Sequence, residues 1–160
     1  VARAAIVAFL ADAFPNAALA PMPTACHQRA DYLQMLHFVA ATMDMALFQV
    51  RMHEHVLGAS EQDPRTIARY RSKFANEVEP QLSERLTGTP FACGEQFSAA
   101  DCMLGHAIFW ARAYGLCQDA VFAGYMKRLS QRPAFTQAFS DAREFVLDAR
   151  GSALSQRFTG

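Results

Sequence analysis

The sequence predicts an all-α helical bundle, with a short helix joined in front of it by a proline-rich linker. Apolar residues recur at three- and four-residue spacing along most of the 160 residues, and no segment alternates β-branched and aromatic residues as strands do. Three prolines fall between residues 15 and 23, where a helix cannot continue. Hydrophobic residues make up 52% of the chain and charged residues 19%, so the chain is too apolar to be disordered.

Charge and cysteine content exclude several classes of protein. Fifteen basic residues balance fifteen acidic ones, so we expect neither nucleic-acid binding nor a polybasic membrane anchor. Uncharged runs are broken by proline or are shorter than the ~20 residues of a spanning helix, and we expect no membrane segment. The four cysteines form no C-x-x-C pair, which predicts no disulfide framework and a cytoplasmic location.

The first helix is predicted over residues 4–14. It ends at Pro15, because the residue before a proline is pushed out of the α region. Residues 15–23 are then expected to form an extended linker.

A long second helix is predicted from Thr24, as its cap, to about Leu57, with Gly58 closing it. Within it Asp44 lies in an otherwise uncharged stretch, where a buried carboxylate needs a partner or a water-filled cleft. Asp44 therefore either faces outward or points into a site or a subunit interface. The apolar stripe on one face of this helix consists of Tyr32, Leu36, Val39, Met43, Leu47 and Val50.

A third helix is predicted from the cap Asp63 and from Pro64 at the first helical position. Its apolar stripe runs through residues 67, 70, 74 and 78. Pro80 predicts a kink or a break, and Gly88 a stop, followed by an irregular loop over residues 89–97.

The sharpest local signal is the capping box formed by Ser98 and Asp101. The helix that follows, to about Tyr114, is apolar almost all round, which is typical of a helix in the centre of a bundle. Two further helices are expected over residues 119–131 and 133–149. Phe135, Phe139, Phe145 and Val146 are the inward candidates of the last helix, and residues 152–160 form a polar tail.

No metal site and no catalytic cysteine are expected. His53 and His55 are two residues apart and point in different directions on a helix, whereas zinc helices space their ligands by four. Cys102 is expected to be buried and inert, and the loop position of Cys93 allows it to be exposed, with no base near either. His27, His37 and His106 have no acidic or thiol partner at ligand spacing.

Trp110 and Tyr114 lie four residues apart on one face of the central helix. Two interpretations remain open: core packing, or one edge of an apolar ligand pocket.

The order of motifs resembles the C-terminal helical domain of the cytosolic glutathione S-transferase family. The motifs are Gly-x-x-Phe-Ser-x-x-Asp at residues 94–101, Trp110 at helical distance, and Arg-Pro-x-Phe at residues 132–135. Residues 4–12 are similar to the last helix of the thioredoxin-like domain that precedes it. The resemblance implies a remnant helix at residues 1–15, a linker at 16–25 and the helical domain at 26–160.

The resemblance also implies a function for the parent protein, which would conjugate the thiol of glutathione to an apolar electrophile. This chain would supply the wall of the electrophile pocket (Phe38, Met43, Trp110 and Tyr114) and the surface of a homodimer. Asp44 and Arg3 are the implied glutathione contacts, and the capping box serves folding. Glutathione is a co-substrate and no cofactor is implied. The thiol-activating residue belongs to the preceding domain, so the chain alone is expected to be inactive in detoxification.

One departure from the family supports an alternative. The family has an acidic or Gln residue followed by Ser where this chain has Ala2 and Arg3. The alternative is a non-catalytic helical module used for protein association. A plain helical bundle that binds an apolar ligand would explain the composition but not the order of motifs.

Overall fold

The computed structural model describes residues 3–138, and these residues contain helices and loops but no strand. The predicted all-α class is therefore confirmed, with one isolated bridge between Phe91 and Gly94. The α-helices are α1 (Arg3–Ala13), α2 (Cys26–His37), α3 (Asp44–Arg51), α4 (Pro64–Lys73), α5 (Glu79–Gly88), α6 (Ala99–Ala113), α7 (Ala120–Ser130) and α8 (Pro133–Ala138). The shorter elements are the 3-10 turn η1 (Pro15–Ala17) and the π-helical segments η2 (Phe38–Met43), η3 (Met52–Val56) and η4 (Phe74–Val78).

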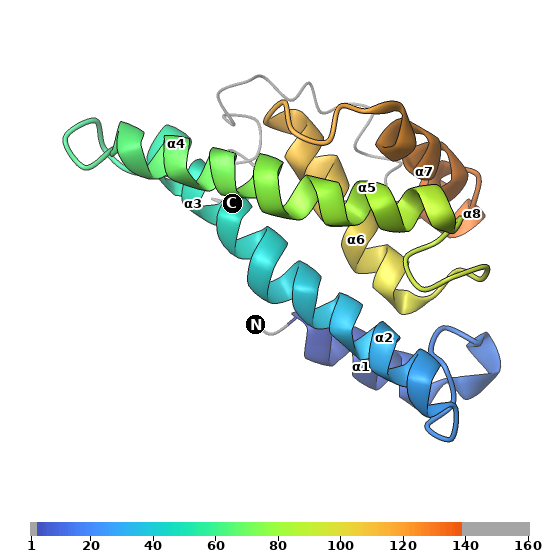
Figure 1. Cartoon of the computed structure of the whole chain (residues 1–160). Coiled ribbons are helices and arrows are strands. Elements are labelled where there is room, and N and C mark those ends of the chain that lie inside the picture. The colour runs from blue at the N-terminus through green and yellow to red at the C-terminus, as the bar shows by residue number, and fades with distance from the viewer. Residues whose placement is uncertain (1–2, 139–160) are drawn as a thin grey trace.

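Two long continuous helices form the front of the molecule. One contains α2, η2, α3 and η3, and the other contains α4, η4 and α5. They pack against each other where α3 meets α4 and diverge toward α2 and α5, with α6 behind them (Figure 1).

The stripe predicted on the first long helix is buried along its whole length, with every one of its six residues at most 1% exposed. The sequence predicts no membrane segment. Among residues 3–138, however, the helix Cys26–Val56 is long and apolar enough to cross a membrane by length and hydropathy alone. A core helix has the same apolar character, and the buried stripe accounts for it here.

The start of this helix differs from the prediction. Thr24 is not its cap: the flanking residue is Ala25, which makes no side-chain capping bond. The linker is not fully extended either, because Pro15 opens the turn η1, a position where its fixed φ suits a helix. The linker then holds α6 in place, since the backbone N–H of Ala99 donates to the carbonyl of Leu19 at 2.7 Å.

Pro80 does not break the second long helix. A proline lacks an N–H and crowds the carbonyl four residues earlier. The wide π turns of η4 precede it, and the N–H of Glu79 donates to the carbonyl of Phe74, five residues back. The Gln81 side chain donates to the carbonyl of Glu77 in the same stretch. The helix therefore absorbs the proline by widening.

The helix α6 is central, as predicted, with contacts to α1, α2, α3 and α7. Gly105 permits the close approach of α7, because a Cβ atom there would lie 2.5 Å from Cδ1 of Leu129. Of the residues predicted to face inward on the last helix, Phe135 packs against the core. Phe139, Phe145, Val146 and the polar tail lie outside the described residues.

The capping box at the start of α6 is formed. Both the backbone N–H of Ser98 (2.8 Å) and its hydroxyl (3.1 Å) donate to Oδ2 of Asp101. The other oxygen, Oδ1, accepts from the N–H of Ala92 (2.7 Å) and from the hydroxyl of Tyr125 (2.8 Å). Asp101 thus joins the loop over residues 89–97, α6 and α7.

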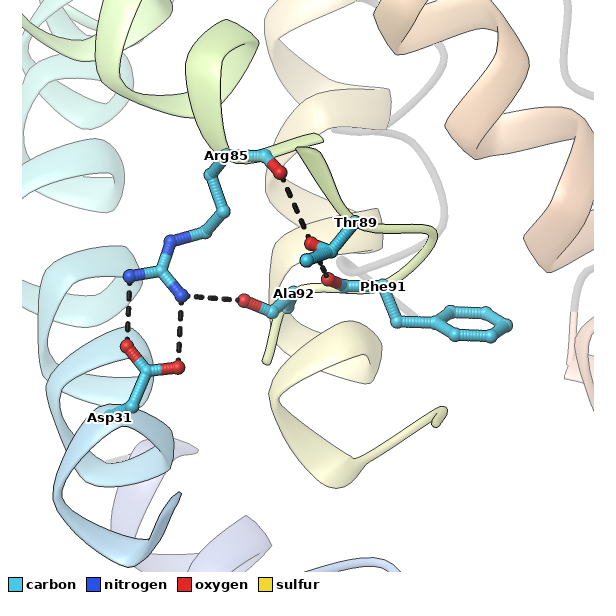
Figure 2. Close-up of polar contacts among 5 residues, drawn as sticks. All are labelled: Asp31, Arg85, Thr89, Phe91 and Ala92. Carbon is cyan, nitrogen blue, oxygen red and sulfur yellow. Dashed lines mark hydrogen bonds and ion pairs between the residues drawn. The ribbon is translucent and has the colours of Figure 1, made fainter. Parts of the chain in front are cut away.

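A second polar cluster ties the same loop to the two long helices (Figure 2). The guanidinium of Arg85 pairs with both carboxylate oxygens of Asp31, at 2.8 and 2.9 Å, and donates to the carbonyl of Ala92 at 2.9 Å. The hydroxyl of Thr89 lies 3.1 Å from the carbonyl of Arg85 and 2.8 Å from that of Phe91. One arginine therefore connects α2, α5 and the loop.

Candidate functional site

Arg3, Asp44 and His106 meet at the junction of α1, α3 and α6. The guanidinium of Arg3 forms an ion pair with Oδ2 of Asp44, and its NH1 lies 3.4 Å from Nδ1 of His106. The Asp44 side chain is 15% exposed, and its Oδ1 is buried with no hydrogen-bond partner among residues 3–138. Asp44 thus has one satisfied oxygen and one that is not.

The surroundings shift the protonation of both titratable groups. Burial raises the pKa of Asp44, although Arg3 opposes this shift. Burial, together with the charge of Arg3, lowers the pKa of His106, and Asp44 opposes it. At neutral pH the imidazole of His106 is therefore neutral.

The π segment η2 sets the direction of Asp44. The N–H of Asp44 donates to the carbonyl of Val39, five residues earlier, so that the turn before Asp44 contains one more residue than an α turn. The extra residue changes the directions of the side chains that follow it, relative to those of a regular α-helix. Asp44 faces Arg3 as a result, and Met43 beside it faces the core.

A cavity of about 340 Å³ opens beside this cluster, between α1, the first long helix and α6. Its volume lies at the lower end of the range for small-molecule sites. The lining is mostly apolar apart from the three clustered side chains. The lining residues are Arg3, Ile6, Val7, Val39, Asp44, Cys102, Met103 and His106.

The predicted burial of Cys102 is wrong. Cys102 is exposed and lines the cavity, because it lies on the side of α6 that turns away from the core, one turn before His106. Cys93 is only half-buried rather than exposed, since its loop folds back onto the core. Desolvation raises the pKa of the Cys102 thiol, and burial raises that of Cys93 to about 12, so neither is an activated nucleophile.

An aromatic row leads away from the cavity along α6. His106, Trp110 and Tyr114 follow one another at four-residue spacing, with ring centroids 6.5 and 6.4 Å apart. The row continues to His55 on η3, whose ring centroid is 5.7 Å from that of Tyr114. Arg71 anchors this far end, since it pairs with Glu54 at 2.8 Å and donates to the carbonyl of Tyr114 at 2.7 Å.

The other two predicted pocket residues lie elsewhere. Met43 is completely buried in the core, so it forms no part of an open pocket wall in this chain. Phe38 lines a different groove of about 350 Å³ between α2 and α5, together with Gln34, Met35, Gln81, Leu82, Glu84 and Arg85. The two cavities share no residue, because neighbouring positions on a helix face different sides. The structure therefore brings Trp110 and Tyr114 together but separates Phe38 and Met43 from them.

Sequence reasoning missed His106, which it treated only as a possible metal ligand. The sequence does contain a signal for His106. This residue lies one turn before Trp110, on the same helix face as Trp110 and Tyr114. Within residues 3–138 no group of three or more metal-binding side chains comes together. Another histidine, His53, accepts a hydrogen bond from the N–H of Asp63 at 3.2 Å.

Part of the chain matches a known protein family. The family model for the glutathione S-transferase C-terminal domain matches residues 64–140. Residues 64–140 therefore match a glutathione S-transferase C-terminal domain. A comparison with curated proteins finds no match.

Solved glutathione S-transferases have the same fold. The theta-class enzyme of the citrus canker pathogen Xanthomonas axonopodis pv. citri, solved with glutathione bound, has a TM-score of 0.67 and 21% identity, over 84% of this chain and 70% of its own. The apo form of the same protein has a TM-score of 0.68 and 21% identity, over 91% of this chain and 74% of its own. A sphingomonad glutathione S-transferase complexed with glutathione has a TM-score of 0.73 and 24% identity, over 86% of this chain and 65% of its own.

Proposed function

We propose that this chain is the acceptor-site half of a glutathione S-transferase, whose whole protein conjugates the glutathione thiol to an apolar electrophile. The observation that carries the proposal is the cavity between α1, the first long helix and α6, where the polar groups Arg3, Asp44 and His106 meet and an aromatic row begins at His106. Trp110 and Tyr114 line the acceptor side. A preceding thioredoxin-like domain holds and activates the thiol, and the protein is cytoplasmic.

The exposed apolar residues of α1 support the division into domains. Ile6, Phe9 and Leu10 lie at helical spacing and are 47%, 69% and 48% exposed. An apolar stripe of this kind is typical of a helix that packs against another layer. We assign residues 1–15 to the last helix of the thioredoxin-like domain, 16–25 to the linker and 26–160 to the helical domain.

Asp44 and Arg3 are the proposed glutathione contacts. The unsatisfied Oδ1 of Asp44 is an acceptor for the glutathione ammonium, and Arg3 is a donor for one of its carboxylates. Asp44→Asn should raise KM for glutathione roughly tenfold or more, as expected for a charge-assisted hydrogen bond, with little change in kcat. Glu84→Gln, a carboxylate in the other groove, is the matched control and should leave KM unchanged.

The direct experiment is a conjugation assay of the complete protein with glutathione and a panel of aryl halide, enone and isothiocyanate acceptors. Activity with one of them is the expected result, and activity should be absent from the 160-residue chain alone. A complete protein that binds no glutathione and conjugates none of the panel would instead favour the non-catalytic interaction module. The observation that favours this alternative is the ion pair of Arg3 with Asp44, which already supplies a cation to the proposed ammonium site.

The homodimer is proposed through the outer side of α3. Met45 and Phe48 are 51% and 49% exposed there, three residues apart on one face. Phe48→Glu should convert a dimer to a monomer in analytical ultracentrifugation. A wild-type protein that sediments as a monomer at micromolar concentration would contradict this assignment.

A further inference from the structure

Arg3 is the first residue of α1, a position at which a helix does not stabilise a cation. The positive end of the helix dipole lies there, and the first turn of α1 contains no acidic residue. An arginine side chain also has a large rotamer entropy to lose when it is fixed in one position. The observed place of the Arg3 guanidinium therefore depends on the groups that it contacts on other helices.

Two helices supply these contacts. Asp44 on α3 accepts from NH2 of Arg3, and Nδ1 of His106 on α6 lies 3.4 Å from NH1. Arginine carries donors and no acceptor, so Nδ1 of His106 is the acceptor of its contact. A planar guanidinium that is bonded at both terminal nitrogens cannot turn without breaking one of the bonds. His106 therefore fixes an orientation that the ion pair with Asp44 alone leaves free.

The imidazole of His106 is itself held in place. Trp110 lies one turn further along α6, with a ring-centroid distance of 6.5 Å and a tilt of 59°, within the range that aromatic pairs favour. One turn earlier, Cys102 lines the same cavity, and desolvation raises the pKa of its thiol, which is therefore uncharged at neutral pH. Among the lining residues, the charged groups that face His106 are thus Arg3 from α1 and Asp44 from α3.

This arrangement leaves donors for a ligand. The contacts with Asp44 and His106 each use one N–H of the Arg3 guanidinium, which carries further N–H groups on the same plane. The Arg3 side chain is 49% exposed, so these remaining groups are accessible from solvent. A carboxylate is the ligand group that such a planar set of donors matches best.

We propose that His106 is a positioning residue: by accepting a hydrogen bond from Arg3, it holds the guanidinium in the orientation that receives a carboxylate of glutathione. The inference rests on the proposed function, because that function makes Arg3 a glutathione contact. His106 itself does not touch glutathione, and its effect passes through Arg3. The neutral imidazole is the competent form, since both nitrogens of an imidazolium are donors and neither can accept from Arg3.

The first test measures the affinity of the complete protein for S-methylglutathione, a thioether that binds without reacting. His106→Leu removes the acceptor and should weaken binding about fivefold, the ratio that corresponds to one hydrogen bond of about 1 kcal/mol. His106→Gln keeps an acceptor oxygen and should remain within about twofold of the wild type. His27→Leu, at an exposed histidine of α2, is the matched control and should leave the affinity unchanged.

A double-mutant cycle shows whether His106 acts through Arg3. In an Arg3→Gln background, His106→Leu should weaken binding by less than about twofold, because the side chain that His106 holds is gone. A residue that only stabilised the local fold would cost the same factor in both backgrounds. In steady-state kinetics of the complete protein, His106→Leu should raise KM for glutathione and leave kcat unchanged.

The second test needs no glutathione. In the ligand-free complete protein, carbon NMR of the Asp44 carboxyl group measures its pKa, which Arg3 and His106 both lower. His106→Leu and His106→Gln both remove the histidine charge, so the difference between them reports the acceptor alone. The pKa of Asp44 should be higher in His106→Leu than in His106→Gln, because Arg3 is held against Asp44 only in the latter. Arg3→Gln should abolish this difference.

Three results would overturn the proposal: wild-type affinity in His106→Leu, the full fivefold loss in the Arg3→Gln background, or equal pKa values of Asp44 in the two histidine variants. The proposed transferase function fails separately. If the two histidine variants differ in the pKa of Asp44 but the complete protein binds no S-methylglutathione, the positioning of Arg3 stands and the assignment of glutathione as its ligand does not.

Discussion

The hydroxyl of Tyr125 donates to Oδ1 of Asp101 at 2.8 Å, and both side chains are completely buried. Asp101 stands in the first turn of α6, where the positive end of the helix dipole favours a carboxylate. With the N–H groups of Ala92 and Ser98 also donating to it, both of its oxygens are satisfied. The carboxylate is therefore a folding element that fixes α7 and the loop over residues 89–97 onto the central helix.

Tyr125→Phe should lower the free energy of unfolding by about 2 kcal/mol, because it removes a buried hydrogen bond to a charged acceptor without changing the ring. Burial raises the pKa of Tyr125 well above its ordinary value, so the phenol keeps its proton and remains a donor at neutral pH. Urea unfolding followed by circular dichroism measures the change. The control is Tyr70→Phe, at a half-buried ring, which should change stability by less than about 0.5 kcal/mol.

Ser98→Ala should cost about 1 kcal/mol, the usual loss for a helix cap. The backbone N–H of Ser98 keeps its bond to Asp101 in this variant, so half of the capping box remains. Ser130→Ala is the control, because that exposed hydroxyl donates to the carbonyl of Lys127 three residues earlier and its loss should change stability little. An unchanged melting temperature for Ser98→Ala would contradict the assigned role of the cap.

The parts of the fold that the sequence predicts correctly are local. The capping box depends on residues three apart, and the buried stripe on a repeat within one helix, so both can be recognised from spacing alone. The continuity of the helix through Pro80 could not be predicted from spacing, because it depends on a π turn that the surrounding packing stabilises. Propensity rules favour a break at that position.

The candidate site shows the same division. Trp110 and Tyr114 are adjacent on one helix and were predicted to share a face. The contacts of Arg3 with Asp44 and with His106 join residues 41 and 103 positions apart. Spacing rules concern neighbours within one helix and cannot predict such contacts. The exposure of Cys102 likewise depends on how α1 and α6 pack against each other. The periodicity of α6 alone does not predict this packing.

Arg85→Met should lower the free energy of unfolding by about 1–2 kcal/mol. It removes a half-exposed ion pair with Asp31, worth at most about 1 kcal/mol, and the bond to the carbonyl of Ala92. Arg85→Lys should recover less than half of the loss, because an ammonium group cannot bind both carboxylate oxygens and the carbonyl in the geometry of Figure 2. Lys73→Met, at an exposed pair with Glu77, is the control and should change stability by less than about 0.5 kcal/mol.

The titration of His106 should move in opposite directions in two variants. Its pKa lies below the ordinary value of 6.5 because of burial and of Arg3, whereas Asp44 raises it. Arg3→Gln removes a lowering charge and should raise the pKa, and Asp44→Asn removes a raising charge and should lower it further. NMR of the imidazole Cε1–H measures both, and shifts of the same sign would contradict the observed cluster.

The same depression of the pKa fixes the sign of the pH dependence of stability. Because the folded chain holds the His106 proton less tightly than the unfolded chain, the unfolded state binds more protons as the pH falls through 6.5. The contribution of His106 is therefore present above pH 6.5 and is lost on acidification. In His106→Gln the fall in stability between pH 7 and pH 5 should be shallower than in the wild type, since glutamine binds no proton in this range.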